Sequence, residues 1–120
     1  MVRTVLVVDD HAGFRELART VLEEGGYSVI GEACDGVTAL AANRRLRPDA
    51  VLLDVHLPDM DGFAVAAALG LERPPPRVVL TSADEDERVG ALLSRSGALR
   101  FVPKAALVHA QMSALWERRP

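Results

Sequence analysis

The chain has 120 residues, which suffices for one domain with a single hydrophobic core and is too short for two such domains. Its 49% apolar and 26% charged residues are typical of a soluble globular protein, and its net charge of −3 disfavours a nucleic-acid-binding surface. A single cysteine, Cys34, excludes an internal disulfide, and the lack of a long apolar run or signal-peptide pattern predicts a cytoplasmic protein without membrane contact.

The first half of the chain predicts two strands, each followed by a helix. The run TVLVV over residues 4–8 is a short strand, and an apolar stripe with helical spacing follows it. The stripe consists of Phe14, Leu17, Ala18, Val21 and Leu22. Asp10 is expected to cap this helix, and the glycine pair at 25–26 to end it. A second strand over 27–33 precedes a helix over 36–46 that ends before Pro48.

The second half continues the alternation. Strands are predicted over residues 50–54, 77–82 and 100–102. Helices are predicted from about Gly62 to the prolines at 74–76, from after Ser82 to Gly97, and over residues 105–118. Acidic residues favour the start of the helix after Ser82. A linker is expected to begin near residue 117.

Strand and helix therefore alternate five times, which predicts right-handed crossovers between parallel strands. The predicted strands are rich in Val, Leu and Ile, as is typical of strands buried on both faces. The expected fold class is α/β, with a doubly wound five-stranded parallel sheet and helices on both faces. Ligands bind to such sheets outside the carboxyl ends of the strands.

Polar residues stand at the carboxyl ends of four predicted strands and form the candidate site. They are Asp9, Asp10, Asp54, Thr81, Ser82 and Lys104. Clustered carboxylates repel one another unless a cation lies among them, and their oxygen atoms suit Mg²⁺, with Mn²⁺ as an alternative. A nucleophilic carboxylate beside a divalent cation and a lysine suits the formation of an aspartyl phosphate.

Four motifs at these strand ends carry a family resemblance. They are VVDD (7–10), LLDVHLPDMDG (52–62), VVLTSA (78–83) and FVPK (101–104). In this order and spacing they resemble the receiver domain of two-component response regulators, over essentially the whole chain. The resemblance implies a flavodoxin-like (βα)5 fold and a single receiver domain over residues 1–120.

The resemblance implies a metal site and a phosphoacceptor. Asp54 matches the phosphoacceptor, which also contacts the metal. Asp10 matches the direct Mg²⁺ ligand, and Asp9 matches the acid that acts through a metal-bound water. His56 would contribute its backbone carbonyl to the metal.

It also implies a switch. Thr81 and Lys104 match the groups that contact the phosphoryl group, and Ser82 stands where a small residue lets that group in. Phe101 matches an aromatic that turns inward when Thr81 moves, although an aromatic in a short strand is also often plain core. The switch would change the surface formed by the helix after Ser82, the strand at 100–102 and the last helix.

The implied function is a signalling switch that accepts a phosphoryl group from a sensor histidine kinase in the presence of Mg²⁺. Such a domain catalyses its own phosphorylation and slow dephosphorylation, and is not a turnover enzyme. Phe14 and Arg15 are candidates for the surface that faces the kinase. Homodimers are expected through the switch surface or through the first and last helices, with no direct nucleic-acid contact by this domain.

The segment after Lys104 indicates which branch of the receiver family the chain resembles. Many receivers have a cis proline there, whereas this chain has Ala105, for which a cis bond would cost about 2.5–4 kcal/mol, so a trans peptide is expected. The segments FVPKAAL, DDH and LPDMDG resemble the NarL/FixJ-type branch, whose receivers are usually joined to a helix-turn-helix DNA-binding domain. Either these residues form a free-standing receiver, or an output domain follows the linker that begins near residue 117; we favour the second.

Two other functions fit parts of the pattern. An enzyme of the haloacid dehalogenase type also uses an aspartate nucleophile, Mg²⁺ and a lysine, but its two acids are two residues apart, whereas Asp9 and Asp10 are adjacent. A silent binding module with a receiver fold is the other alternative. The histidines show no shared ligand spacing, so no side-chain role is expected for them, and Cys34 is expected to be a small, at least half-buried side chain.

Overall fold

Five parallel strands form one sheet in the computed structural model, which describes residues 2–84, 88–108 and 114–117. The strands are β1 (Thr4–Val8), β2 (Ser28–Ala33), β3 (Ala50–Asp54), β4 (Arg77–Ser82) and β5 (Arg100–Pro103). Their order in the sheet is β2-β1-β3-β4-β5, which is the doubly wound, flavodoxin-like order. The predicted fold class is therefore confirmed.

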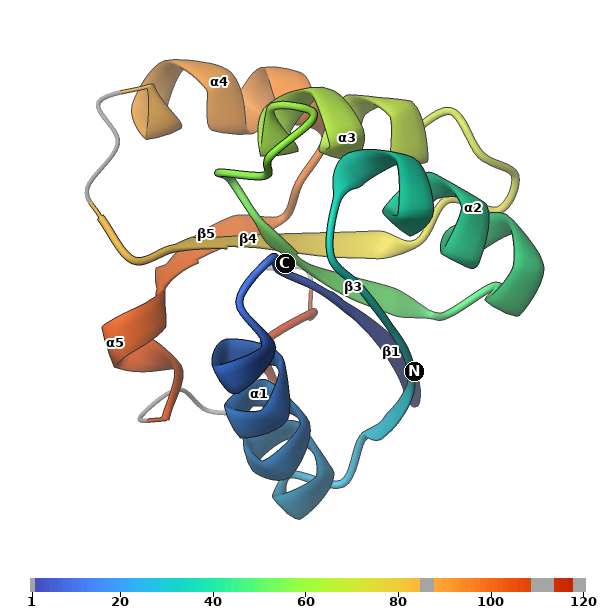
Figure 1. The fold of residues 1–120 in the computed structure, drawn as a ribbon. Helices are drawn as coiled ribbons and strands as arrows, with labels where there is room; N and C mark the ends of the chain where they lie inside the picture. The colour runs from blue at the N-terminus through green and yellow to red at the C-terminus, as the bar shows by residue number, and fades with distance from the viewer. Residues whose placement is uncertain (1, 85–87, 109–113, 118–120) are drawn as a thin grey trace.

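Four helices connect the strands and a fifth follows the last strand, and within the described residues these five helices cover both faces of the sheet. They are α1 (Ala12–Glu24), α2 (Gly36–Leu46), α3 (Gly62–Leu69), α4 (Val89–Ser96) and α5 (Lys104–Leu107). Figure 1 shows α1 and α5 on one face and α2, α3 and α4 on the other. Within the described ranges, every helix is too short or too polar to traverse a lipid bilayer.

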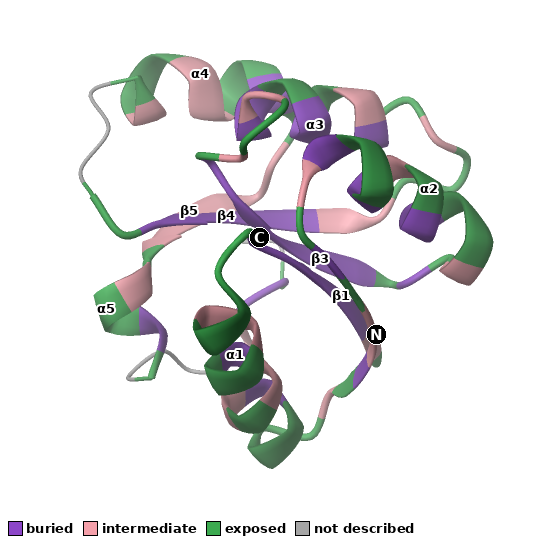
Figure 2. Cartoon of the chain, viewed as in Figure 1, coloured by how far each residue is buried: buried purple, intermediate pink, exposed green. Residues whose placement is uncertain are grey.

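The inner strands β1 and β3 are almost continuously apolar because they supply two cores at once (Figure 2). Leu6 and Leu53 belong to the cluster under α2 and α3, whereas Val7 and Leu52 belong to the cluster under α1. Since successive side chains in a strand point to opposite faces, every interior position of β1 and β3 is buried. A polar side chain on β1 or β3 can therefore reach solvent or a ligand only at the ends of these strands.

The indole of Trp116 closes the core on the α1 side. Its side chain is fully buried, its Nε1 donates a hydrogen bond to the carbonyl of Val51 at 3.2 Å, and its ring meets Tyr27 edge-on with centroids 5.2 Å apart. The Arg77 guanidinium donates to the Trp116 carbonyl at 3.1 Å. These contacts hold residues 114–117 against the sheet. Residue 114 is in a 3₁₀ conformation and residues 115–116 form a turn, in place of the α-helix predicted there. Residues 109–113 and 118–120, and so the predicted linker, lie outside the described part.

Several predicted details of the helices are wrong. The N-cap of α1 is His11, not Asp10, because the Asp10 side chain pairs with the His11 ring. Leu17, assigned to the apolar stripe of α1, is 45% exposed. Helix α4 begins at Val89 and not directly after Ser82, since the Ser82 hydroxyl accepts the backbone N–H of Asp84 and so favours a turn; residues 85–87 are outside the described part.

Two predictions about single residues have opposite outcomes. Cys34, expected to be at least half buried, is exposed. The one cis peptide bond within the described ranges joins Arg73 and Pro74, so the Lys104–Ala105 peptide is trans as predicted.

Asp49 fastens the start of β3 to the start of β1. Its carboxylate accepts the backbone N–H groups of Arg3 at 2.8 Å and Thr4 at 3.0 Å, and its own N–H donates to the Thr4 hydroxyl at 2.9 Å. The N–H of Arg3 and then that of Thr4 lower the pKa of Asp49 below its ordinary value of 3.8. The folded protein therefore binds this proton less tightly than the unfolded chain, so the carboxylate stabilises the fold above about pH 4 and ceases to do so as the pH falls through the depressed pKa.

Replacing Asp49 by Asn should consequently lower the free energy of unfolding by about 1–2 kcal/mol at pH 7. The difference from the wild type should shrink as the pH is lowered from 4 to 2. Urea unfolding at several pH values measures it, with Glu16→Gln on the exposed side of α1 as a control that changes stability by less than about 0.5 kcal/mol. A pH-independent difference would show that the charge of Asp49 does not matter.

Candidate functional site

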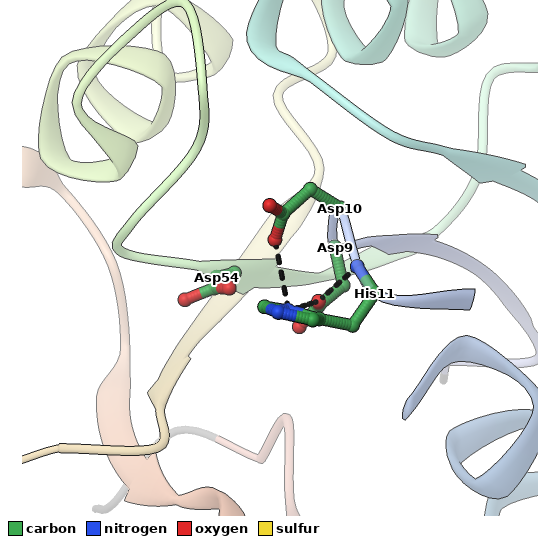
Figure 3. A group of neighbouring side chains, drawn as sticks. All are labelled: Asp9, Asp10, His11 and Asp54. Atoms are coloured by element: carbon green, nitrogen blue, oxygen red, sulfur yellow. Dashed lines mark hydrogen bonds and ion pairs between the residues drawn. The ribbon is translucent and has the colours of Figure 1, made fainter. Parts of the chain in front are cut away.

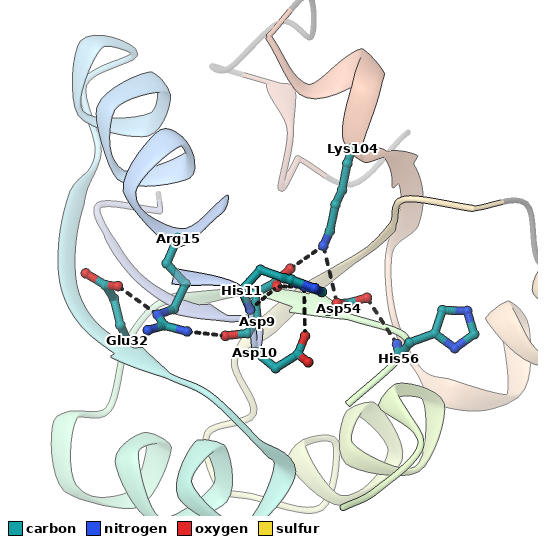
Figure 4. Close-up of polar contacts among 8 residues, drawn as sticks. All are labelled: Asp9, Asp10, His11, Arg15, Glu32, Asp54, His56 and Lys104. Carbon is teal, nitrogen blue, oxygen red and sulfur yellow. Dashed lines mark hydrogen bonds and ion pairs between the residues drawn. The ribbon is translucent and has the colours of Figure 1, made fainter. Parts of the chain in front are cut away.

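The predicted site residues meet at the carboxyl edge of the sheet. Asp9 follows β1, Asp54 ends β3, and Lys104 follows β5 as the first residue of α5. Asp54 and Thr81 are register partners on adjacent strands. Figure 4 shows that Lys104 reaches from the α5 side toward Asp9 and Asp54, so the topology brings together groups up to 95 positions apart in the printed sequence.

The Lys104 ammonium lies between two buried carboxylates. Its Nζ is 2.6 Å from Asp9 Oδ2 and 3.3 Å from Asp54 Oδ2. The Asp9 side chain is fully buried, that of Asp54 almost fully, and Lys104 is 13% exposed. Its Nζ also lies 4.4 Å from the centre of the Phe14 ring, a cation–π contact. Lys104 is thus the positive charge that balances the acidic pair in the absence of a metal.

The two sides of this ion pair affect each other's protonation. Burial raises the pKa of Asp54, and the charge of Asp9 raises it further, against hydrogen bonds from the His56 N–H and Lys104. Burial by itself lowers the pKa of Lys104, but the hydrogen bond to Asp9 and the charge of Asp54 together raise it above 10.5. Lys104 is therefore fully charged at neutral pH, and the acidic pair depends on it.

Lys104 is also the only lysine in the chain, which otherwise uses arginine for its positive charge. An ammonium is a compact charge with three donors, whereas a guanidinium is planar and larger. The compact ammonium of a lysine suits a position between two carboxylates better than a guanidinium does. The presence of one lysine among many arginines is therefore a further feature of the sequence that points to Lys104, and the motif comparison did not use it.

Three carboxylates and one imidazole converge beside Lys104. Ligand atoms of Asp9, Asp10, His11 and Asp54 all lie within 4.8 Å of one another (Figure 3). The backbone N–H of His11 donates to Asp9 Oδ1 at 2.9 Å, and the ring nitrogen Nδ1 of His11 is 3.0 Å from Asp10 Oδ1. Carboxylate oxygens in this number suit a hard divalent cation such as Mg²⁺. The spacing of the histidines did not predict that His11 joins this group.

The turn that carries Asp9 and Asp10 is fixed by Arg15. The Arg15 guanidinium donates to the Asp9 carbonyl at 2.6 Å and to Glu32 Oε1 at 3.0 Å (Figure 4). Arg19 binds the other Glu32 oxygen at 2.8 Å and thereby lowers the pKa of Glu32. Arg15, predicted to face a kinase, is therefore first of all a brace between α1, β2 and the acidic turn.

The loop after β3 is held at both ends. The His56 N–H donates to Asp54 Oδ1 at 3.0 Å, and the Gly62 N–H donates to the Val55 carbonyl at 2.7 Å. Asp59 reaches across to accept the N–H groups of Gly36 at 2.7 Å and Val37 at 3.0 Å, at the start of α2. This loop therefore keeps Asp54 in place and ties it to the neighbouring helix.

Thr81 and its neighbours complete the edge. Thr81 is fully buried beside Asp54, and its hydroxyl has no hydrogen-bond partner within the described residues. Ser82 is also buried, and Phe101 is half-buried against the cluster under α2 and α3. A buried hydroxyl without a partner is costly, so it marks a position at which another group is expected to supply one.

The chain resembles known proteins along most of its length. The sequence profile of the response regulator receiver domain matches residues 5–114. A protein-glutamate methylesterase/protein-glutamine glutaminase of Hahella chejuensis is 41% identical over 102 residues, which cover 83% of this chain and 29% of that protein. The transcriptional regulatory protein NarL of Mycobacterium tuberculosis is 41% identical over 101 residues, covering 83% and 47%. The chain spans less than half the length of these relatives.

Solved structures agree with the sheet order. The signal receiver domain of the response regulator NarL from Mycobacterium tuberculosis is similar with a TM-score of 0.83, 36% identity and 98% of both chains covered. The response regulator domain of Thermotoga maritima CheB is similar with a TM-score of 0.82 and covers both chains fully, but at 23% identity it supports the fold alone.

Gly62 is the glycine at which a side chain has least room. A Cβ there would lie 2.3 Å from the Asp54 carbonyl oxygen and 2.6 Å from Val55 Cα. Gly62→Ala should push back the loop that positions Asp54 and lower the free energy of unfolding by about 1–3 kcal/mol. Gly90→Ala in α4, where a Cβ meets nothing within 4 Å, should instead raise it by about 0.5–1 kcal/mol. Chemical unfolding and the amide NMR shifts of residues 54–62 test the pair.

Removing the Lys104 charge should destabilise the metal-free protein. Lys104→Met leaves Asp9 and Asp54 buried without their counter-ion, which should lower the free energy of unfolding by about 3 kcal/mol in EDTA at pH 7. Adding millimolar Mg²⁺ should recover part of the loss, and Lys104→Arg should lose less than Lys104→Met. Equal stability of Lys104→Met and wild type in EDTA would contradict this account.

Proposed function

Since the chain belongs to the response regulator receiver domain family, we propose that it is a phosphorylation-dependent switch of a two-component system, with Asp54 as the phosphoacceptor. The observation that carries the proposal is the position of Asp54. It is a buried carboxylate at a strand end, held between the His56 N–H and the Lys104 ammonium and beside the lone Thr81 hydroxyl. Fixed positioning of this kind is what favours in-line attack on an incoming phosphoryl group.

The acidic group would hold Mg²⁺, with Mn²⁺ as an alternative. Asp10 and Asp54 would bind it directly, Asp9 through a water, and His56 through its backbone carbonyl. The ion would neutralise charge on the oxygens of the transferring phosphoryl group. The fit rests on the donor set, because three carboxylates that converge within 4.8 Å need more positive charge than Lys104 alone supplies.

The chain's own residues would then carry the transfer. An oxygen of the Asp54 carboxylate forms the new bond to phosphorus while the bond to the phosphohistidine nitrogen of a sensor kinase breaks. Lys104 is already within 3.3 Å of Asp54 and would follow the new negative charge. Buried Ser82 is small enough to leave room beside Asp54. The same residues support slow self-catalysed hydrolysis and no turnover of other substrates.

Thr81 would convert the added phosphoryl group into a change of shape. Its hydroxyl is buried beside Asp54 and lacks a partner within the described ranges, so a phosphoryl oxygen is a favourable acceptor for it. Movement of Thr81 toward Asp54 would free space that half-buried Phe101 can enter. The result would be a shift in the surface of α4, β5 and α5 between two arrangements.

That surface would pass the signal on. We assign a sensor histidine kinase as the donor, and homodimers through α4-β5-α5 or α1-α5 as the regulated contacts. A DNA-binding output domain is the preferred recipient, because the chain is similar over nearly its full length to the NarL receiver. Relatives named as methylesterases are as similar in sequence, so a methylesterase is the alternative output.

The first test is the intact mass of the protein after incubation with acetyl phosphate and Mg²⁺, with and without EDTA. We expect the gain of one phosphoryl group, dependent on Mg²⁺ and abolished in Asp54→Asn. Asp84→Asn, an exposed aspartate near the same sheet edge, is the matched control and should be phosphorylated normally.

Each rival function has its own outcome in this experiment. Phosphorylation that persists in Asp54→Asn would reject Asp54 as the acceptor. Steady release of phosphate from small phosphate esters would favour a phosphatase of the haloacid dehalogenase type. No phosphorylation by acetyl phosphate or by any phosphorylated kinase, with the fold intact, would favour a silent module.

A further inference from the structure

His11 places an imidazole on the open side of the acidic group. Its Nδ1 lies 3.0 Å from Asp10 Oδ1 and 3.3 Å from Asp9 Oδ1, although the side chain is 71% exposed and sits in a turn before α1. As the N-cap of α1, it makes no side-chain hydrogen bond to that helix. The ring is thus held by the carboxylates and by no capping interaction (Figure 3).

The two halves of the group differ in access. Asp9 and Asp54 are buried and face Lys104, whereas Asp10 is 36% exposed and lies with His11 toward solvent. A cation that arrives from solvent would therefore meet Asp10 and His11 first. Close by, on the inner side of the site, the Thr81 hydroxyl is buried without a partner within the described residues, an independent sign that this edge is built to receive a ligand.

An imidazole changes which cations such a site prefers. Mg²⁺ takes oxygen ligands and gains little from nitrogen, whereas Co²⁺, Ni²⁺ and Zn²⁺ bind imidazole well. Three carboxylates with one imidazole within 4.8 Å offer a mixed oxygen and nitrogen donor set. Against these carboxylate acceptors Nδ1 acts as a donor. A metal would take the place of that hydrogen and bind Nδ1 in the tautomer that carries its hydrogen on Nε2.

We infer that His11 is a metal-specificity residue of this site, whose imidazole increases the preference of the acidic group for borderline divalent ions such as Co²⁺, Ni²⁺ and Zn²⁺ over Mg²⁺. The inference rests on the proposed function only in that it uses the same metal site. Its consequence is a receiver whose metal occupancy responds to transition metals as well as to Mg²⁺.

The test is direct metal binding to untagged protein, measured by calorimetry with Mg²⁺, Co²⁺ and Ni²⁺ separately and by the visible spectrum of bound Co²⁺. His11→Ala and His11→Gln should each weaken Co²⁺ and Ni²⁺ binding by at least about tenfold, the size of effect typical for a lost metal-site group. Mg²⁺ binding should weaken less than threefold, and the Co²⁺ absorption band should shift. The glutamine variant keeps a polar side chain in the turn.

Asp84→Asn is the matched control, because Asp84 is an exposed acidic residue near this sheet edge that is not among the converging ligand groups. It should leave the ratio of Co²⁺ to Mg²⁺ affinity unchanged. An equal loss of Mg²⁺ and Co²⁺ affinity in the His11 variants would overturn the inference, since His11 would then only position Asp9 and Asp10. Unchanged Co²⁺ binding in the His11 variants, or an equal loss in Asp84→Asn, would overturn it as well.

The same samples separate this inference from the proposed function. Suppose that Asp54 is phosphorylated in a Mg²⁺-dependent way and that the His11 variants bind Co²⁺ as tightly as the wild type. That result would reject the inference and leave the proposed switch intact. Failure of wild-type protein to bind any divalent cation, together with no phosphorylation, rejects both.

Discussion

One ammonium group shared by two buried carboxylates is the constraint on which this site depends. Asp9 and Asp54 could not both stay ionised out of solvent without Lys104. The parallel sheet makes this arrangement possible, because it brings the carboxyl ends of β1, β3 and β5 together while the interior of the sheet stays apolar. The braces around it, from Arg15 to the loop after β3, hold charged groups where repulsion would otherwise separate them.

This charge balance also bears on the proposed phosphorylation of Asp54. New negative charge there would enter a region where one cation is already shared and one hydroxyl has no partner among the described residues. The neighbouring groups must redistribute to satisfy it, and those able to do so come from β4 and α5. If every charge and hydroxyl at these strand ends already had its partners, the same modification would change the neighbouring structure little.

Sequence reasoning predicted the parts that depend on periodicity and on strand ends. Continuous apolar runs implied a doubly wound sheet, and its topology implied that Asp9, Asp54, Thr81 and Lys104 would meet. Sequence reasoning was wrong at positions where a polar side chain has more than one possible hydrogen-bond partner nearby. Asp10 pairs with a histidine in place of capping α1, and Ser82 forms a turn that delays α4. No pattern of spacing encodes such choices, since they depend on how separate segments approach.

The reach of Asp59 across to the start of α2 has a mechanical consequence. It fastens the loop after β3, which follows Asp54, to the half of the molecule built on β2, β1 and β3. On the other half, α4 is joined to α3 by the side chain of Arg88, which pairs with Asp61 and lies over the Phe63 ring. The proposed displacement of Thr81 would therefore meet a loop fastened to backbone N–H groups of α2 on one side and a contact between two side chains, Arg88 and Asp61, on the other.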